Sequence, residues 1–161
     1  MKKKQDYPLS RHFYFHEMIE GSLMSPEGHA MNWVHIDECD EMALKKFCAR
    51  MEVVRADINA KFMSDLGFDQ IPLIVSSGWR CRAWELHRGR SGNSQHTIAA
   101  MDVYPGNCSK ALSDKIMLYM EKKYFPRATG WQGGFAIQRP TAKRTGFAHF
   151  DGRPKVARWW Y

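Results

Sequence analysis

The chain has 161 residues, of which 44% are hydrophobic and 25% are charged, so it is long enough for one domain with a core of useful size. This composition excludes extended disorder, and no run approaches the roughly 20 apolar residues of a membrane-spanning helix. The net charge of +7 predicts an anionic partner, which could be nucleic acid, an acidic membrane surface or an anionic cell-wall polymer. We expect a flexible basic tail over residues 1–10 and a single domain over residues 11–161.

Two segments have the periodicity of amphipathic helices. Between Asp40 and Leu66 the apolar side chains recur at three and four steps, at Leu44, Phe47, Cys48, Met51, Val54, Ile58 and Phe62. Asp40 is expected to cap the start of this helix, and Gly67 is expected to end it. A second helix is predicted over Ala111–Tyr124, with an apolar stripe at Leu112, Ile116, Met117 and Met120.

Five short segments read as strands. These are Ile71–Ser76, Ala99–Tyr104, Gly133–Gln138, Phe147–Phe150 and Val156–Tyr161. The second of them is followed by a Pro-Gly pair, which is typical of a turn. Helices early in the chain and strands late in it predict an α+β fold, in which helices pack on a small antiparallel sheet.

The start of the chain and its cysteines bear on where the protein is made. Residues 1–6 are basic, but no apolar stretch of signal-peptide length follows them. We therefore expect cytoplasmic synthesis without a signal peptide. Cysteines at positions 39, 48, 81 and 108 show no Cys-x-x-Cys spacing, so we expect four free thiols rather than a four-cysteine zinc site.

Two histidines and an aspartate, His96, Asp102 and His149, occur in an order that can hold one zinc ion. Zinc accepts imidazole nitrogen and carboxylate oxygen, and a catalytic site uses three protein ligands and leaves a fourth position for water. Six steps along a straight strand would separate His96 from Asp102 by roughly 20 Å, too far for one ion. The chain must therefore turn between them, with His96 in a loop and Asp102 on a strand.

These residues belong to motif blocks that resemble the zinc D-alanyl-D-alanine carboxypeptidase family, which includes murein endopeptidases and phage endolysins and shares its fold with the hedgehog signalling domain. The blocks are Ser77–Arg80, Asn93–His96, Ala100–Asp102, Gly146–Asp151, the closing Arg158–Trp159 pair and the lead-in Arg11–Met18. The resemblance implies that His96, Asp102 and His149 bind zinc. It also implies that Arg80 binds substrate, and we assign Ser94 the same role.

The blocks depart from the family pattern in two places. The spacing from His96 to Asp102 is one residue shorter than in the family and lacks its glycine. Where family members place a catalytic acid or a histidine shortly before the last zinc ligand, this chain has Gly146 and Phe147. Because Asp151 lies two residues after His149 and would share its strand face, we take Asp151 as the candidate general base or orienting residue, with Glu85 as the next candidate.

The expected function is hydrolysis of peptide bonds in peptidoglycan stems or cross-links, by a carboxypeptidase or an endopeptidase. A monomeric lysis protein of a phage or prophage, reaching the wall after release or delivery, fits this expectation. An alternative is a domain of the same fold that binds cell wall or a partner without cutting it. A third reading is a single-strand nucleic-acid binder, supported only by the basic charge and by Trp79, Trp84, Trp131, Trp159 and Trp160. No nucleic-acid-binding motif accompanies them, so nucleic acid is not the expected partner.

Overall fold

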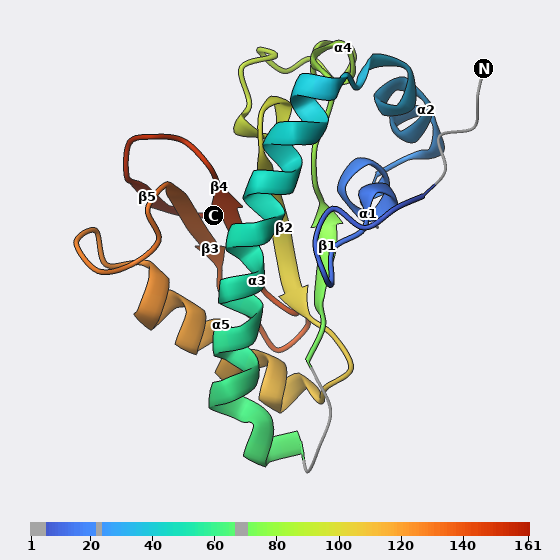
Figure 1. The fold of residues 1–161 in the computed structure, drawn as a ribbon. Coiled ribbons are helices and arrows are strands. Elements are labelled where there is room, and N and C mark those ends of the chain that lie inside the picture. The colour runs from blue at the N-terminus through green and yellow to red at the C-terminus, as the bar shows by residue number, and fades with distance from the viewer. Residues whose placement is uncertain (1–5, 22–23, 67–70) are drawn as a thin grey trace.

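The computed structural model describes residues 6–21, 24–66 and 71–161. Its centre is a five-stranded sheet with the strand order β1-β2-β4-β3-β5 (Figure 1). The strands are β1 (Leu73–Ser77), β2 (Ala100–Pro105), β3 (Gly134–Gln138), β4 (Phe147–Asp151) and β5 (Ala157–Trp160). All five predicted strands are therefore present, with ends that differ from the predicted ones by up to two residues.

The predicted α+β class is confirmed, but the sheet is mixed rather than antiparallel. Strand β5 runs parallel to β3, whereas the other three neighbouring pairs are antiparallel. Strand β4 ends at Asp151, beside the start of β3, and the short link 152–156 brings Ala157 opposite Gly134. The last strand therefore starts at the same end of the sheet as β3 and runs in the same direction.

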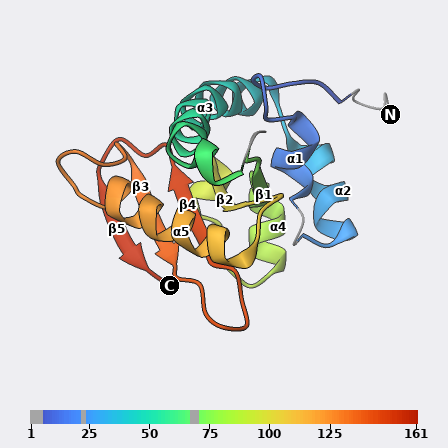
Figure 2. The same ribbon diagram turned by 90° about the horizontal axis from the view of Figure 1, so that it is seen from below.

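The helices are α1 (Phe15–Glu20), α2 (Pro26–His35), α3 (Glu38–Leu66), α4 (Arg82–His87) and α5 (Lys110–Tyr124). In both ribbon views α1 and α2 lie beside the β1 edge, while β5 forms the opposite edge (Figures 1 and 2). Tyr124 of α5 packs its ring on Phe150 of β4, and Phe47 of α3 reaches the same apolar cluster through Trp131. Helices α3 and α5 therefore cover the sheet face that carries Phe150.

Successive residues of a strand point to opposite faces, so His149 lies on the other face from its neighbours Ala148 and Phe150. The covered face holds the core, with Met101 and Val103 of β2 completely buried there. The face that carries Asp102 and His149 is thereby left for the functional site.

Sequence patterning missed α1, α2 and α4, which have six to ten residues each. Helix α2 nevertheless has a readable start, because the Ser25 side chain accepts a hydrogen bond from the Gly28 N–H and Pro26 occupies the first helical position. Helix α3 begins two residues before the predicted cap. Asp37 and Asp40 each accept a hydrogen bond from the other's backbone N–H, so Asp40 is the third helical residue rather than the cap. The predicted end at Gly67 lies outside the described residues.

Of the tail expected over residues 1–10, the structure describes residues 6–10, and these contact the rest of the fold. Tyr7 stacks on Phe15 with ring centroids 4.9 Å apart, Pro8 forms a β-bridge with Tyr14, and Leu9 is buried. Leu9 belongs to the core and Tyr7 packs against it, whereas residues 1–5 lie outside the described part of the chain. The four cysteines are free thiols, as expected. No helix among the described residues is both long and apolar enough to cross a membrane.

Candidate metal centre

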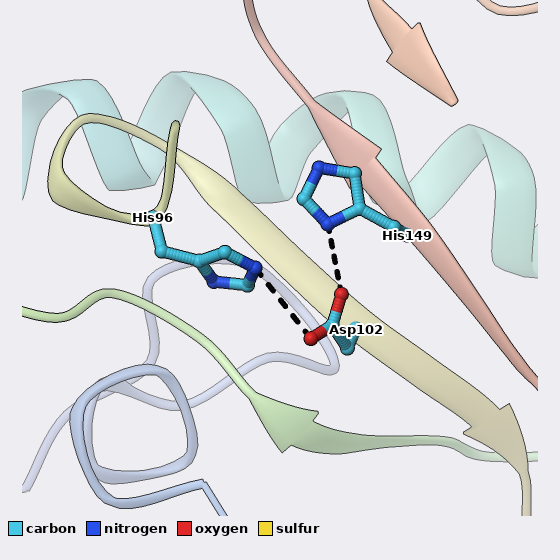
Figure 3. A group of neighbouring side chains, drawn as sticks. All are labelled: His96, Asp102 and His149. Atoms are coloured by element: carbon cyan, nitrogen blue, oxygen red, sulfur yellow. Dashed lines mark hydrogen bonds and ion pairs between the residues drawn. The ribbon is translucent and has the colours of Figure 1, made fainter. Parts of the chain in front are cut away.

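The three predicted ligands come together on the uncovered face of the sheet (Figure 3). Asp102 on β2 and His149 on β4 lie directly opposite each other in the strand register. His96 lies in a short 3-10 helix, Gln95–Thr97, that turns the chain into β2. The prediction that the chain turns between His96 and Asp102 is therefore confirmed.

The three side chains offer ligand atoms at distances suited to one ion. His149 Nδ1 lies 2.8 Å from Asp102 Oδ1, and His96 Nε2 lies 3.5 Å from Asp102 Oδ2. One ligand atom from each residue can be chosen so that all lie within 4.8 Å of one another. Both histidines are buried, at 4% and 3% exposure. His96, Asp102 and His149 are therefore close enough to bind a metal ion.

Each histidine has its other ring nitrogen held by an acceptor. His96 Nδ1 lies 2.6 Å from the Gly78 carbonyl oxygen, and His149 Nε2 lies 3.1 Å from Asp151 Oδ2. A ring nitrogen that donates its hydrogen to such an acceptor leaves the second nitrogen free to bind a metal, and ligand histidines usually have this support. The free nitrogens are then the two that face Asp102.

The charges of the cluster follow from its burial and its partners. Burial lowers the pKa of His96, so this imidazole is kept neutral, in the form that binds metals. Burial acts in the same direction on His149, but hydrogen bonds to Asp102 and Asp151 outweigh it and raise the pKa of His149. Burial opposes ionisation of Asp102, yet the two histidines hold its pKa well below the usual range. In the absence of metal, a protonated His149 ring therefore lies between two carboxylates, with Nδ1 facing Asp102 and Nε2 facing Asp151.

Asp151 sits behind His149 rather than in front of the cluster. It is completely buried, and its Oδ1 accepts hydrogen bonds from the backbone N–H groups of Gly134 at 2.9 Å and Arg153 at 3.0 Å. The Arg153 guanidinium pairs with the same carboxylate, at 2.6 Å from Nη2 to Oδ2. As predicted, Asp151 shares a face with His149, but its carboxylate contacts the ring nitrogen that points away from Asp102. This is the position of an orienting residue.

Arg80 is fixed beside the cluster. Its Nη1 donates to Ser77 Oγ at 2.7 Å and its Nη2 to Ser94 Oγ at 3.4 Å, while Nε lies 2.7 Å from Glu85 Oε1. The Arg80 backbone N–H also donates to the His96 carbonyl oxygen at 2.8 Å. Ser94, predicted to contact substrate, thus contacts Arg80, and its hydroxyl also accepts the His96 N–H at 3.3 Å.

A cavity of about 570 Å³ opens over the cluster and is lined by His96, Asp102 and His149 together with Arg80, Glu85 and Ser94. Its remaining described wall includes Arg90, Ser91, Asn93, Gln95, Phe147, Arg153, Trp159 and Tyr161. The Trp159 ring lies 5.2 Å from His149, because the residue between them in the sheet register is the small Ala136. The cavity thus combines a metal-binding floor, arginines and an aromatic wall.

Sequence reasoning missed three residues that shape this site: Asn32, Arg90 and Arg153. Asn32 of α2 is completely buried and joins Ile19 to the segment around Arg80. Its Nδ2 donates to the carbonyl oxygens of Ile19 at 2.8 Å and Trp79 at 3.0 Å, and its Oδ1 accepts the Cys81 N–H at 2.8 Å. An asparagine within a short helix gives no sequence signal for this role. The Asp-Gly-Arg turn after β4 could have suggested Arg153.

Comparison with protein-family models finds no match to this chain, and neither curated proteins nor solved structures yield one. The resemblance to the zinc peptidase family therefore rests on the motif residues and on the cluster that they form.

Proposed function

We propose that this protein is a zinc peptidase that hydrolyses peptide bonds of peptidoglycan stems or cross-links. The observation that carries the proposal is the cluster of His96, Asp102 and His149. In each histidine the ring nitrogen that points away from Asp102 contacts a hydrogen-bond acceptor. Two imidazoles and a carboxylate form a ligand set that zinc accepts, with a fourth position left for water. Bound zinc supplies a water of lowered pKa and polarises the scissile carbonyl.

The surrounding residues have distinct parts in this proposal. Arg80, held in a fixed orientation by Ser77, Ser94 and Glu85, presents its guanidinium to a carbonyl or carboxylate of the substrate. Asp151 orients His149 and favours the ring form whose Nδ1 faces the metal. The aromatic wall at Trp159 and Tyr161 contacts apolar parts of the bound peptide.

One observation favours a second candidate, a metal-binding domain of the same architecture that recognises cell wall without cutting it. Among the described residues that line the cavity, both carboxylates are already engaged. Asp102 contacts the two histidines, and Glu85 pairs with Arg80 and Arg90. A general base needs a free acceptor within reach of the attacking water, and Glu85 meets this need only if an arginine releases it.

Digestion of purified peptidoglycan separates the two candidates. The zinc-loaded protein is incubated with peptidoglycan, with and without a chelator, and the fragments are identified by mass. The peptidase proposal predicts fragments from cleaved peptide bonds that disappear with the chelator and with His149→Ala. Sedimentation with peptidoglycan but no new fragments, with zinc fully loaded, would overturn the peptidase proposal in favour of the binding domain.

A further inference from the structure

The edge strand β5 divides its aromatic side chains between two cavities (Figure 2). Trp159 and Tyr161 line the metal cavity, whereas Trp160, between them, points to the opposite face of the sheet because side chains alternate along a strand. Trp160 and Tyr161 also line a second cavity of about 500 Å³, whose other described lining is Ile137 and Arg139. Tyr161 therefore borders both cavities, and a ligand that extends past it from the metal cavity enters the second one.

A carboxylate of α5 fixes the two exposed side chains of the second cavity. Glu121 Oε1 accepts the Trp160 indole N–H at 3.0 Å, and it accepts Arg139 Nη2 at 2.6 Å. Arg139 Nε lies 2.9 Å from Glu121 Oε2, and the Trp160 ring packs on Phe125 with ring centroids 4.0 Å apart. Trp160 is nonetheless 56% exposed and the Arg139 side chain 64% exposed. Both side chains are thus held in place before a ligand binds, which lowers the entropy cost of binding.

The second cavity has the chemistry of a site for a sugar. A sugar ring has an apolar C–H face, which packs on an aromatic ring, and a rim of hydroxyl and amide groups that accept hydrogen bonds. The Trp160 N–H is already bonded to Glu121, so Trp160 meets a ligand through its ring. Among the described residues none accepts a hydrogen bond from Arg139 Nη1, which is therefore a donor for the rim. Glu121 compensates the charge of Arg139, so the cavity suits a neutral polar ligand better than an anion.

We propose that Trp160 and Arg139 bind a sugar ring of the glycan strand while the peptide stem attached to that strand occupies the metal cavity. The inference rests on the proposed peptidase function and specifies its substrate as a stem peptide still joined to glycan, rather than a free peptide. A third cavity, of about 350 Å³, is lined in part by Glu121 and Phe125, the two residues that contact Trp160. It offers room for the next sugar of the strand.

Two matched substrates test this. Both are soluble stem-peptide fragments with the bond that is cleaved in peptidoglycan, one joined to its N-acetylglucosamine–N-acetylmuramic acid disaccharide and the other acetylated at the amino terminus instead. The zinc-loaded protein is expected to cleave the disaccharide form with a kcat/KM about 10-fold higher, the scale of one aromatic contact and one hydrogen bond. Trp160→Ala is expected to bring the ratio of the two kcat/KM values close to one. Trp160→Phe is expected to keep part of the preference, because an aromatic face remains.

Tyr14→Ala serves as the matched control, because Tyr14 is an exposed aromatic residue that lines neither the metal cavity nor the second cavity. Its ratio should equal that of the unaltered protein, and zinc content should be the same in all variants. Equal cleavage of the two substrates by the unaltered protein, or a Trp160→Ala effect that falls equally on both, would overturn the inference while leaving the peptidase proposal intact.

If neither substrate nor peptidoglycan is cut, the peptidase proposal fails and the sugar site is tested by binding alone. The probe is a peptide-free tetrasaccharide of alternating N-acetylglucosamine and N-acetylmuramic acid. Titration should shift the NMR signal of the Trp160 indole N–H, which is identified by its loss in Trp160→Phe, and Trp160→Ala should abolish the binding heat. No shift and no heat would show that this cavity binds no glycan. Binding to vesicles of anionic lipid without binding to the tetrasaccharide would also overturn the inference and would make this edge a membrane-contacting surface.

Discussion

At the scale of single residues, the protonation of His149 connects the fold to metal binding. Hydrogen bonds to Asp102 and Asp151 raise its pKa despite burial, whereas burial lowers that of His96. A metal must displace the His149 proton, because only the neutral ring binds metals. Zinc affinity is therefore expected to be constant above the raised pKa of His149 and to fall about tenfold per pH unit below it. Chelator-competition titrations across this range measure the effect, and a flat profile would contradict it.

Asp151→Asn separates an orienting residue from a general base. An orienting carboxylate predicts zinc binding weakened by about 10- to 100-fold, and a pH break that moves downward because His149 has lost one of its two carboxylates. Arg153→Gln is the control, since it removes the ion pair with Asp151 but keeps the contact between Asp151 and His149. Unchanged zinc affinity with slower turnover would instead identify Asp151 as the base.

Gly134 shows how closely the backbone approaches this carboxylate. A Cβ at Gly134 would lie 2.1 Å from Asp151 Oδ2, whereas one at Gly152 would meet nothing closer than 3.7 Å. Gly134→Ala is expected to destabilise the protein by about 1–3 kcal/mol and to weaken zinc binding, because the carboxylate must shift. Gly152→Ala should change neither by a comparable amount. Denaturant unfolding and zinc titration of the two variants provide the comparison.

At the scale of elements, the two long helices and the five strands were predictable from the sequence, and the three short helices were not. The stripe of α3 and the apolar runs of β1 and β2 have enough residues to show a period. Helices α1 and α4 have six residues each, too few for a period. Helix α1 packs against β1 and α2, and α4 packs against α2, so contacts with distant segments hold both. The parallel placement of β5 depends on its direct pairing with β3, a strand that is separated from it in the sequence by β4, and no local pattern encodes this pairing.

In the site, too, the residues marked by motif spacing were predictable, whereas the contacts between segments distant in sequence were not. His96, Asp102 and His149 were found because motif spacing marks them, and the strand register then places two of them opposite each other. The pairing of Glu85 with Arg90 and the position of Asp151 behind His149 depend on tertiary geometry. The sequence placed Asp151 on the face of His149 as either a base or an orienting residue, and the choice between these two depends on contacts that the chain alone does not give.

A substitution of Asn32 tests whether α2 stabilises the segment around Arg80. Its side chain makes three hydrogen bonds that join Ile19, Trp79 and Cys81 in a completely buried position. Asn32→Ala is expected to cost about 2–4 kcal/mol, because two carbonyl oxygens and one N–H lose a buried partner. Thermal and denaturant unfolding measure this cost. A loss below about 0.5 kcal/mol, typical of exposed positions, would show that α2 is held by other contacts.

At the scale of the whole molecule, the metal cluster exists only in the folded chain. Its candidate ligands come from β2, β4 and the 3-10 turn. The segment around Arg80, beside the cluster, is held to α2 by the hydrogen bond from Asn32 to the Trp79 carbonyl oxygen. An unfolded chain has no comparable arrangement, so zinc binding should stabilise the fold by mass action. At a free zinc concentration 100 times the dissociation constant, the gain is about 2.7 kcal/mol.

For a domain of this size, that gain corresponds to a rise in Tm of about 5–11 °C. Thermal unfolding with added zinc and with a chelator measures the difference between the two states. His149→Ala is expected to abolish the rise, because it removes one ligand from the cluster and leaves only two. His35→Ala is the matched control, since His35 lies at the end of α2, is exposed and does not line the cavity. A rise that persists in His149→Ala would show that zinc binds elsewhere on the protein, and the absence of any rise in the unaltered protein would contradict the metal centre itself.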